Sequence, residues 1–150
     1  MVAWFKLSSL NSNQEIFSKT DELGKFGHAF GWGLKVTSGN CLQAIIGTIE
    51  GWKFLSSSTV LEANVWYQVA FASDQATAML YLNGILDSTI SIVGGPNHDS
   101  SIVNPGSHDI GIGVLLSNYP LYFFNGTIDD VRLYNRALSN SVIQQLYNDV

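Results

Sequence analysis

Residues 124–139 read Phe-Asn-Gly-Thr-Ile-Asp-Asp-Val-Arg-Leu-Tyr-Asn-Arg-Ala-Leu-Ser, and this stretch decides the fold of the chain. Its Asn-Gly dipeptide tolerates positive φ and favours a turn. The aliphatic and β-branched residues after the turn predict a strand over residues 128–134. Ser139 stands before residues with helical spacing, where a hydroxyl can cap a helix N-terminus. The stretch therefore predicts a turn, a strand and a short helix, in that order.

The composition is that of a globular sheet protein. Of its 150 residues, 46% are hydrophobic, 13% are charged and 14 are glycine, which argues against disorder and favours many turns. The net charge is −5 with 7 scattered basic residues, so nucleic acid is not expected as a partner. No apolar run approaches about 18 residues, so no membrane insertion is predicted. The single cysteine, Cys41, lies in an apolar run and is expected in the core. We expect one domain over residues 1–150.

Short strands are predicted along the whole chain, because β-branched and aromatic residues alternate with polar ones between turn signals. The expected strands are residues 2–7, 15–19, 29–36, 41–49, 54–61, 66–72, 77–82, 85–93, 109–116 and 128–134. The only expected helix covers residues 139–148, where apolar residues recur at helical spacing. Trp4 and Trp66 lie in strand motifs and are expected in the core. Many short strands with one terminal helix predict an antiparallel β-sandwich.

One predicted strand, over residues 29–36, has side chains on one face only. Trp32, Leu34 and Val36 share a face, whereas Gly31 and Gly33 occupy the other. Such glycines often mark the close approach of a backbone or a ligand. We expect Trp32 to pack in the core, because its neighbours at period 2 are all apolar.

Five motifs, in order along the chain, resemble those of laminin-G-like and concanavalin A-like jelly-roll domains. Residues 2–6 resemble the family's "S-A-W-V-K", residues 16–19 match its "I-F-S-K", and residues 64–70 resemble its "W-Y-H-V-A". Residues 80–84 resemble its "L-Y-V-N-G", and residues 124–139 resemble its closing "F-N-G-x-I-D-D-V-R-I-Y-N-R-A-L-S". The resemblance implies an all-β, antiparallel jelly-roll β-sandwich of two sheets with a short C-terminal helix. Its members are usually secreted or at the cell surface, but the chain shows no signal peptide, so its localisation stays open.

The resemblance also implies an exposed sheet edge. Family members usually carry further strands before "S-A-W-V-K", and the first strand pairs beside the last. This chain starts almost at that motif, so we expect the strand over residues 128–134 to have an open flank. Because unpaired edges attract other chains, we predict a homodimer or strand exchange at this edge.

A structural calcium ion is a further implication of the resemblance. The family's equivalent of Asp129 or Asp130 often helps to hold calcium together with backbone carbonyls, and hard oxygen ligands suit this ion. The alternative is that these carboxylates accept turn hydrogen bonds or pair with Arg132.

Carbohydrate recognition is the function that the resemblance favours. A lectin-type site places an aromatic ring under a sugar face and adds polar side chains. Trp52 and Tyr119 are expected in turns, where rings can be exposed. The candidate ligand-binding residues are Trp52, Tyr119, Asn118, Asn97, His98 and Tyr122, with Asp99 and His108 as further polar loop residues. The alternatives are a protein–protein adhesion or assembly module and a remnant without a ligand.

Catalysis is not expected, although some relatives of this fold are glucanases. Glycoside hydrolysis needs two carboxylates that face each other across the bond. The "E-x-D-x-x-E" pattern of those glucanases is absent. Asp129 and Asp130 are adjacent, so regular strand alternation would point them to opposite faces. We therefore predict a non-catalytic module, or at most a glycoside hydrolase relic.

Overall fold

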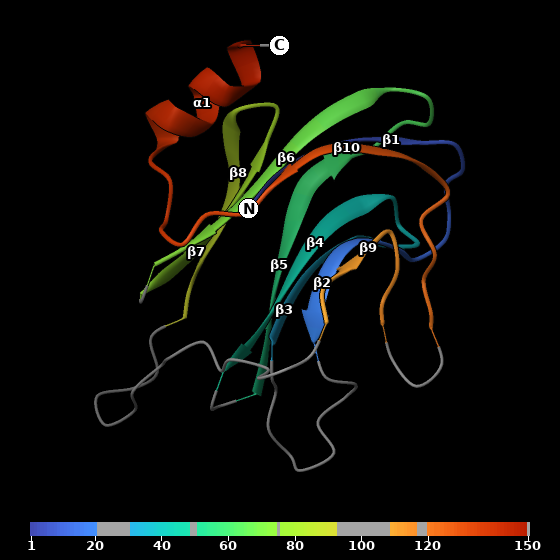
Figure 1. The fold of residues 1–150 in the computed structure, drawn as a ribbon, viewed down its shortest axis with the longest axis horizontal. Helices are drawn as coiled ribbons and strands as arrows, with labels where there is room; N and C mark the ends of the chain where they lie inside the picture. The colour runs from blue at the N-terminus through green and yellow to red at the C-terminus, as the bar shows by residue number, and fades with distance from the viewer. Residues whose placement is uncertain (21–30, 49–50, 75, 93–108, 117–119, 150) are drawn as a thin grey trace.

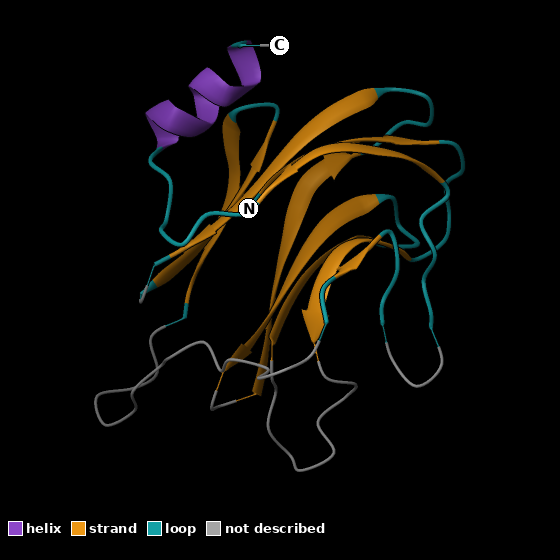
Figure 2. Ribbon diagram, in the orientation of Figure 1, coloured by secondary structure: helices purple, strands orange, loops and turns teal. Residues whose placement is uncertain are grey.

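Two five-stranded antiparallel sheets face each other in the computed structural model, which describes residues 1–20, 31–48, 51–74, 76–92, 109–116 and 120–149 (Figure 1). A single helix among the described residues lies outside the sandwich (Figure 2). This arrangement confirms the predicted all-β sandwich with a short C-terminal helix.

The first sheet has the strand order β10-β1-β6-β7-β8. Its strands are β1 (Val2–Leu7), β6 (Trp66–Ser73), β7 (Thr77–Leu82), β8 (Ile85–Ser91) and β10 (Gly126–Arg132). The Asn83–Gly84 turn joins β7 to β8, and both residues have the positive φ that a tight hairpin of this kind requires.

The second sheet has the strand order β5-β4-β3-β2-β9. Its strands are β2 (Gln14–Thr20), β3 (Gly31–Val36), β4 (Cys41–Thr48), β5 (Gly51–Val60) and β9 (Gly111–Ile112). The inner faces of both sheets supply the core, where Phe5, Leu34, Ile46, Val69 and Leu80 are all buried. Trp32 stacks on Phe17 with ring centroids 4.9 Å apart and packs against this core, as predicted.

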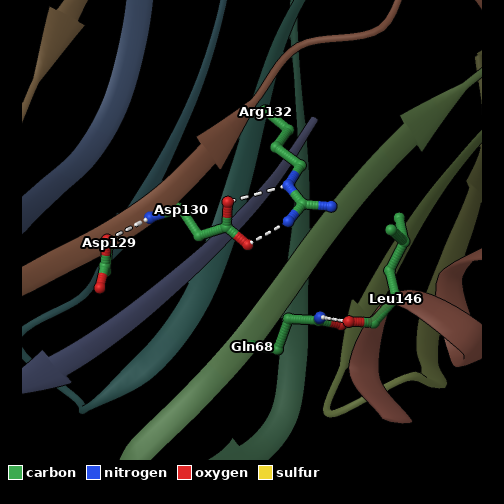
Figure 3. Close-up of polar contacts among 5 residues, drawn as sticks. All are labelled: Gln68, Asp129, Asp130, Arg132 and Leu146. Carbon is green, nitrogen blue, oxygen red and sulfur yellow. Dashed lines mark hydrogen bonds and ion pairs between the residues drawn. The ribbon is translucent and has the colours of Figure 1, made fainter. Parts of the chain in front are cut away.

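Helix α1 (Asn140–Asn148) packs on the outer face of the first sheet. Ser139 caps it, and its hydroxyl accepts a hydrogen bond from the Val142 N–H at 3.5 Å. Ile143 is fully buried in a second apolar cluster together with Val2 and Ala70. Gln68 Nε2 donates to the Leu146 carbonyl at 2.9 Å and ties the helix to β6 (Figure 3). No helix among the described residues is long and apolar enough to cross a membrane.

The predicted core positions of Trp4 and Trp66 are wrong. Both lie on the outer face of the first sheet, where Trp4 pairs with Gln68 and Lys6 pairs with Trp66 across β1 and β6. Trp66 is 40% exposed, and Trp4 is half-buried because Tyr147 of the helix stacks on it. The core face of β1 is instead the one that carries Ala3, Phe5 and Leu7.

Some predicted strand boundaries also change. Strand β5 begins at Gly51, so Trp52 lies in a strand and not in a turn. The strand expected over residues 109–116 is limited to Gly111–Ile112, because the chain bends at Gly113, which has φ +72°. Residues 29 and 30 of the strand expected over residues 29–36 lie outside the described part of the chain, and the rest of that strand is confirmed as β3.

Strand β10 forms an edge of the first sheet and pairs only with β1 among the described strands. The open flank expected for this strand is therefore present in the described part of the chain. The homodimer predicted at this edge stays a prediction, and light scattering at high protein concentration would test it.

Candidate functional site

The outer face of the second sheet carries a pocket of about 210 Å³, which we call the sheet-face pocket. It is smaller than typical drug-sized sites of about 300–1,000 Å³, so it suits one small ring or the end of a longer chain. Its lining is mostly apolar, with a few polar groups. The lining residues are Glu15, Thr20, Gly33, Lys35, Ile45, Trp52, Phe54, Leu115, Leu121 and Tyr122.

A lack of side chains in the middle of the sheet creates this pocket. Leu34 and Val36 of β3 point into the core, so Gly33 and Lys35 lie on the outer face. Across the sheet, Gly33 pairs with Ile45 and Ile45 pairs with Phe54, while Gly47 pairs with Trp52. The glycines therefore leave a depression in the sheet surface, which we call the pocket floor, beside the aromatic rings of β5. The close backbone approach predicted from the glycines of β3 is found at Gly31, where an added Cβ atom would lie 2.0 Å from the Lys19 carbonyl oxygen.

The opposite wall is built by the segment between β9 and β10. The Leu115 and Leu121 backbones form an isolated bridge, and the Tyr122 carbonyl accepts a hydrogen bond from the Glu15 N–H at 2.7 Å. These bonds hold the segment beside β2. Tyr122 has φ +57°, a conformation that a bulky residue adopts at a cost of about 1–3 kcal/mol, and such strain often concentrates at binding sites. Its side chain is 41% exposed, so the ring remains available.

Two ionisable residues meet on the pocket floor. Glu15 and Lys35 are direct partners across β2 and β3, and both line the pocket. Glu15 is only 2% exposed. Burial raises the pKa of Glu15 to about 8, and the nearby Lys35 charge opposes that rise without cancelling it. The Lys35 Nζ atom lies 5.8 Å from the centroid of the Tyr122 ring, within reach of a cation–π contact. Strongly shifted carboxyl groups in a pocket are candidates for function.

The structure brings together two of the predicted ligand-binding residues. Trp52 and Tyr122 lie far apart in the sequence and line the same pocket. The other predicted residues lie outside the described part of the chain. They are Asn97, His98, Asn118 and Tyr119, together with the further loop residues Asp99 and His108.

Sequence reasoning missed Glu15, Lys35 and Phe54. Their proximity depends on the strand register, including an irregularity between Glu15 and Phe17 that lets Ile16 and Phe17 both reach the core. The sequence feature that could have pointed to these residues is the glycine face of β3. A strand without side chains on one face leaves the side chains of its neighbouring strands exposed beside it.

A second cavity, of about 510 Å³, lies on the outer face of the other sheet and is lined by Trp4, Trp66, Asp129 and Asp130. Both indole rings already have neighbours, since Tyr147 stacks on Trp4 and Lys6 Nζ lies 5.1 Å from the Trp66 ring centroid. The sheet-face pocket has three aromatic side chains in its described lining, Trp52, Phe54 and Tyr122, against the two of this cavity.

The predicted separation of Asp129 and Asp130 onto opposite faces is wrong, since both line this cavity. The register between β1 and β10 shifts here, with Trp4 opposite Asp129 and Val2 opposite Arg132. Asp130 has φ +50° at this shift, so regular alternation does not hold. Asp130 accepts two hydrogen bonds from Arg132, at 2.8 and 2.7 Å (Figure 3).

These two carboxylates do not by themselves make a calcium site. Calcium takes about 6–8 oxygen ligands, and Asp130 already pairs with Arg132. Among the described residues, no group of three or more His, Cys, Asp or Glu could hold a metal ion. Calcium at Asp129 and Asp130 stays a prediction, which a calcium titration of the melting temperature would test.

Comparison with known proteins supports the fold. The carbohydrate-binding module of the Ruminococcus gnavus intramolecular trans-sialidase, described as CBM40, superposes with a TM-score of 0.78 at 20% identity, covering 97% of this chain and 80% of that one. The same module bound to α2,3-sialyllactose gives a TM-score of 0.76 at 19% identity, with the same coverage. Domain 4 of an extracellular arabinanase from Geobacillus stearothermophilus, in complex with arabinotriose, gives 0.69 at 19% identity, covering 97% of this chain and 64% of that one.

No curated protein sequence is significantly similar to the chain. A family model, described as the concanavalin A-like lectin/glucanases superfamily, matches residues 1–144. That match covers nearly all of the sandwich and most of its helix, and the chain therefore belongs to the concanavalin A-like lectin/glucanases superfamily.

Proposed function

We propose that this chain is a non-catalytic carbohydrate-recognition module and that it binds sugar in the sheet-face pocket. The observation that carries the proposal is the pairing of accessible aromatic rings, Trp52 and Tyr122, with two polar groups on a glycine floor. Aromatic faces suit the C–H faces of a sugar ring, and convergent polar groups fix its hydroxyls.

The pocket's charge pattern argues against hydrolysis. Glu15 is the only carboxylate among the described residues that line it. A glycosidase of the usual type needs a pair of carboxylates, so this pocket lacks the second member.

Similar structures support a sugar ligand. The module from Ruminococcus gnavus is described in complex with α2,3-sialyllactose, and the arabinanase domain is described in complex with arabinotriose. At about 20% identity these similarities establish the fold, and the identity of the sugar must be determined by experiment.

A glycan array followed by calorimetry tests the proposal. We expect hits that free saccharide competes away. Trp52→Ala should then weaken binding of the best hit by about 2 kcal/mol or more, roughly 30-fold, because the ring is lost. Trp66→Ala is the matched control, since this exposed tryptophan lies on the opposite sheet, and it should bind normally. Equal losses in both variants, or no competed hit, would reject the proposal.

A protein ligand is the second candidate, and exposed apolar side chains near the pocket favour it. Phe54 is 52% exposed, Leu121 is 46% exposed and Phe123 is 66% exposed. Exposed apolar patches mark interaction surfaces of several kinds. Under this alternative, the array stays blank, and Phe54→Ala weakens capture of a protein partner.

A further inference from the structure

The charge on the floor of the sheet-face pocket points to the class of sugar that it takes. Lys35 projects from β3 on the pocket side and lies against the Tyr122 ring, so its ammonium stays near the pocket. Glu15 lies directly opposite on β2, with its Oε1 atom folded over Gly33, where an added Cβ atom would be 2.9 Å away.

These two residues form an unusual pair, because Glu15 is almost completely buried while Lys35 is only half-buried. Burial disfavours the charged carboxylate and raises the pKa of Glu15 to about 8, although Lys35 works in the other direction. At neutral pH Glu15 is therefore mostly protonated. It can donate a hydrogen bond and does not neutralise Lys35.

No other described residue of the pocket offsets the Lys35 charge. Among the described lining residues, the remaining ionisable side chain is that of Tyr122, from the segment after β9, and β4 and β5 contribute Ile45, Trp52 and Phe54. A cation among apolar walls interacts with an anion more strongly than it would in bulk water.

We propose that the sheet-face pocket selects saccharides that carry a carboxylate, such as sialic or uronic acids. In this arrangement the Lys35 ammonium pairs with the sugar carboxylate, the protonated Glu15 donates a hydrogen bond to the same group or to a neighbouring oxygen, and Trp52 and Tyr122 contact the ring. The inference rests on the proposed function, because it assigns a ligand class to the same pocket.

This arrangement couples the binding of an acidic sugar to the protonation of Glu15. A bound carboxylate near Glu15 further favours the protonated form of its side chain. Binding above pH 8 therefore requires proton uptake and weakens as the pH rises, whereas binding between pH 6 and 7 changes little.

Calorimetry with pairs of sugars, one acidic and one neutral in each pair, tests the inference. The pairs are sialyllactose against its neutral methyl ester and methyl glucuronide against methyl glucoside, which also separate sialic from uronic acid. We expect one acidic member to bind at least about tenfold more tightly than its neutral partner, because a charge-assisted bond adds to the common contacts. Lys35→Met keeps most of the length of the unbranched side chain, removes its charge and should remove that preference.

Glu15→Gln provides the decisive variant, since glutamine mimics the neutral form of Glu15. We expect it to keep the preference for the acidic sugar at pH 6.5. At pH 9.5 it should bind more tightly than the wild type, because it cannot ionise. Circular dichroism melting of each variant confirms that the fold is intact.

The outcomes separate this inference from the proposed function. Neutral sugars that bind as tightly as acidic ones, with a loss in Trp52→Ala, would overturn the inference and leave the proposed function standing. An acidic preference that survives Lys35→Met would also overturn it. If no sugar binds and the fold is intact, the proposed function fails, and the inference fails with it.

Discussion

Gly33 and Glu15 pack so closely on the outer face of the sheet that a methyl group on Gly33 would lie 2.9 Å from Glu15 Oε1. The absence of a side chain at residue 33 thus makes room for the buried carboxyl and for the floor of the sheet-face pocket. The neighbouring Gly31 is constrained differently, because it has φ +104° and a methyl group there would lie 2.0 Å from the Lys19 carbonyl oxygen.

The two glycines are therefore expected to respond differently to alanine. Gly33→Ala should fold, since the end of the Glu15 side chain can shift, but it should bind sugar about tenfold more weakly because the methyl group fills the floor. Gly31→Ala should lose at least about 3 kcal/mol of unfolding free energy from backbone strain and collision. Urea denaturation and calorimetry measure the two effects. The interpretation fails if the two variants are equally stable.

The buried Glu15 should make the stability of the protein depend on pH. Its pKa is about 8 in the folded state against an ordinary value of 4.5, so the native state binds more protons between these values. The free energy of unfolding should then fall as the pH rises from 4.5 to 8, by about 3–5 kcal/mol in total, and level off above that.

Glu15→Gln should remove this dependence, because the amide does not titrate. Denaturation at pH 5 and pH 9 measures the difference, and the variant should be the more stable protein at pH 9. Parallel pH profiles for the two proteins would show that Glu15 ionises freely in the folded state.

Tyr122 should contribute to binding and little to stability. Replacing it with glycine relieves the positive φ and removes a ring that is 41% exposed. We expect Tyr122→Gly to lose most sugar affinity while its unfolding free energy stays within about 1 kcal/mol of the wild type, since the relief offsets the lost packing. A large loss of stability would indicate that the tyrosine is structural.

The packing of α1 on the first sheet should depend on a single buried side chain. Ile143 is fully buried against the outer face of the first sheet, so Ile143→Ala should cost about 2–5 kcal/mol. Gln145→Ala is a matched control on the exposed side of the helix and should change little. Similar unfolding free energies for the two variants would mean that the helix is not firmly docked.

Most strands and the two-sheet architecture could be predicted from the sequence, but the inner and outer faces could not. Alternation in Val2–Leu7 shows that Trp4 and Lys6 share one face and that Phe5 and Leu7 share the other. It does not show which face meets the second sheet. Because α1 covers part of the outer face, that face also carries apolar residues, which is why the sequence pattern misplaces Trp4 in the core.

The site was predictable only in part, for a similar reason. Trp52 and Tyr122 were identified by residue type, and the glycines of β3 indicated an open surface. Glu15 and Lys35 looked like ordinary polar positions of two strands. Their roles follow from the β2–β3 register and from the burial of Glu15, which arise only when the sheet and the segment after β9 come together.

Nuclear magnetic resonance of the tryptophan side chains tests the central claim most directly. The chain has four tryptophans, so the indole N–H signals can be assigned by single substitutions and followed during titration with the best array hit. The proposed site predicts that the Trp52 signal shifts in a saturable way while those of Trp4 and Trp66, on the opposite sheet, stay in place. Saturable shifts of Trp4 or Trp66 with an unmoved Trp52 would contradict the account.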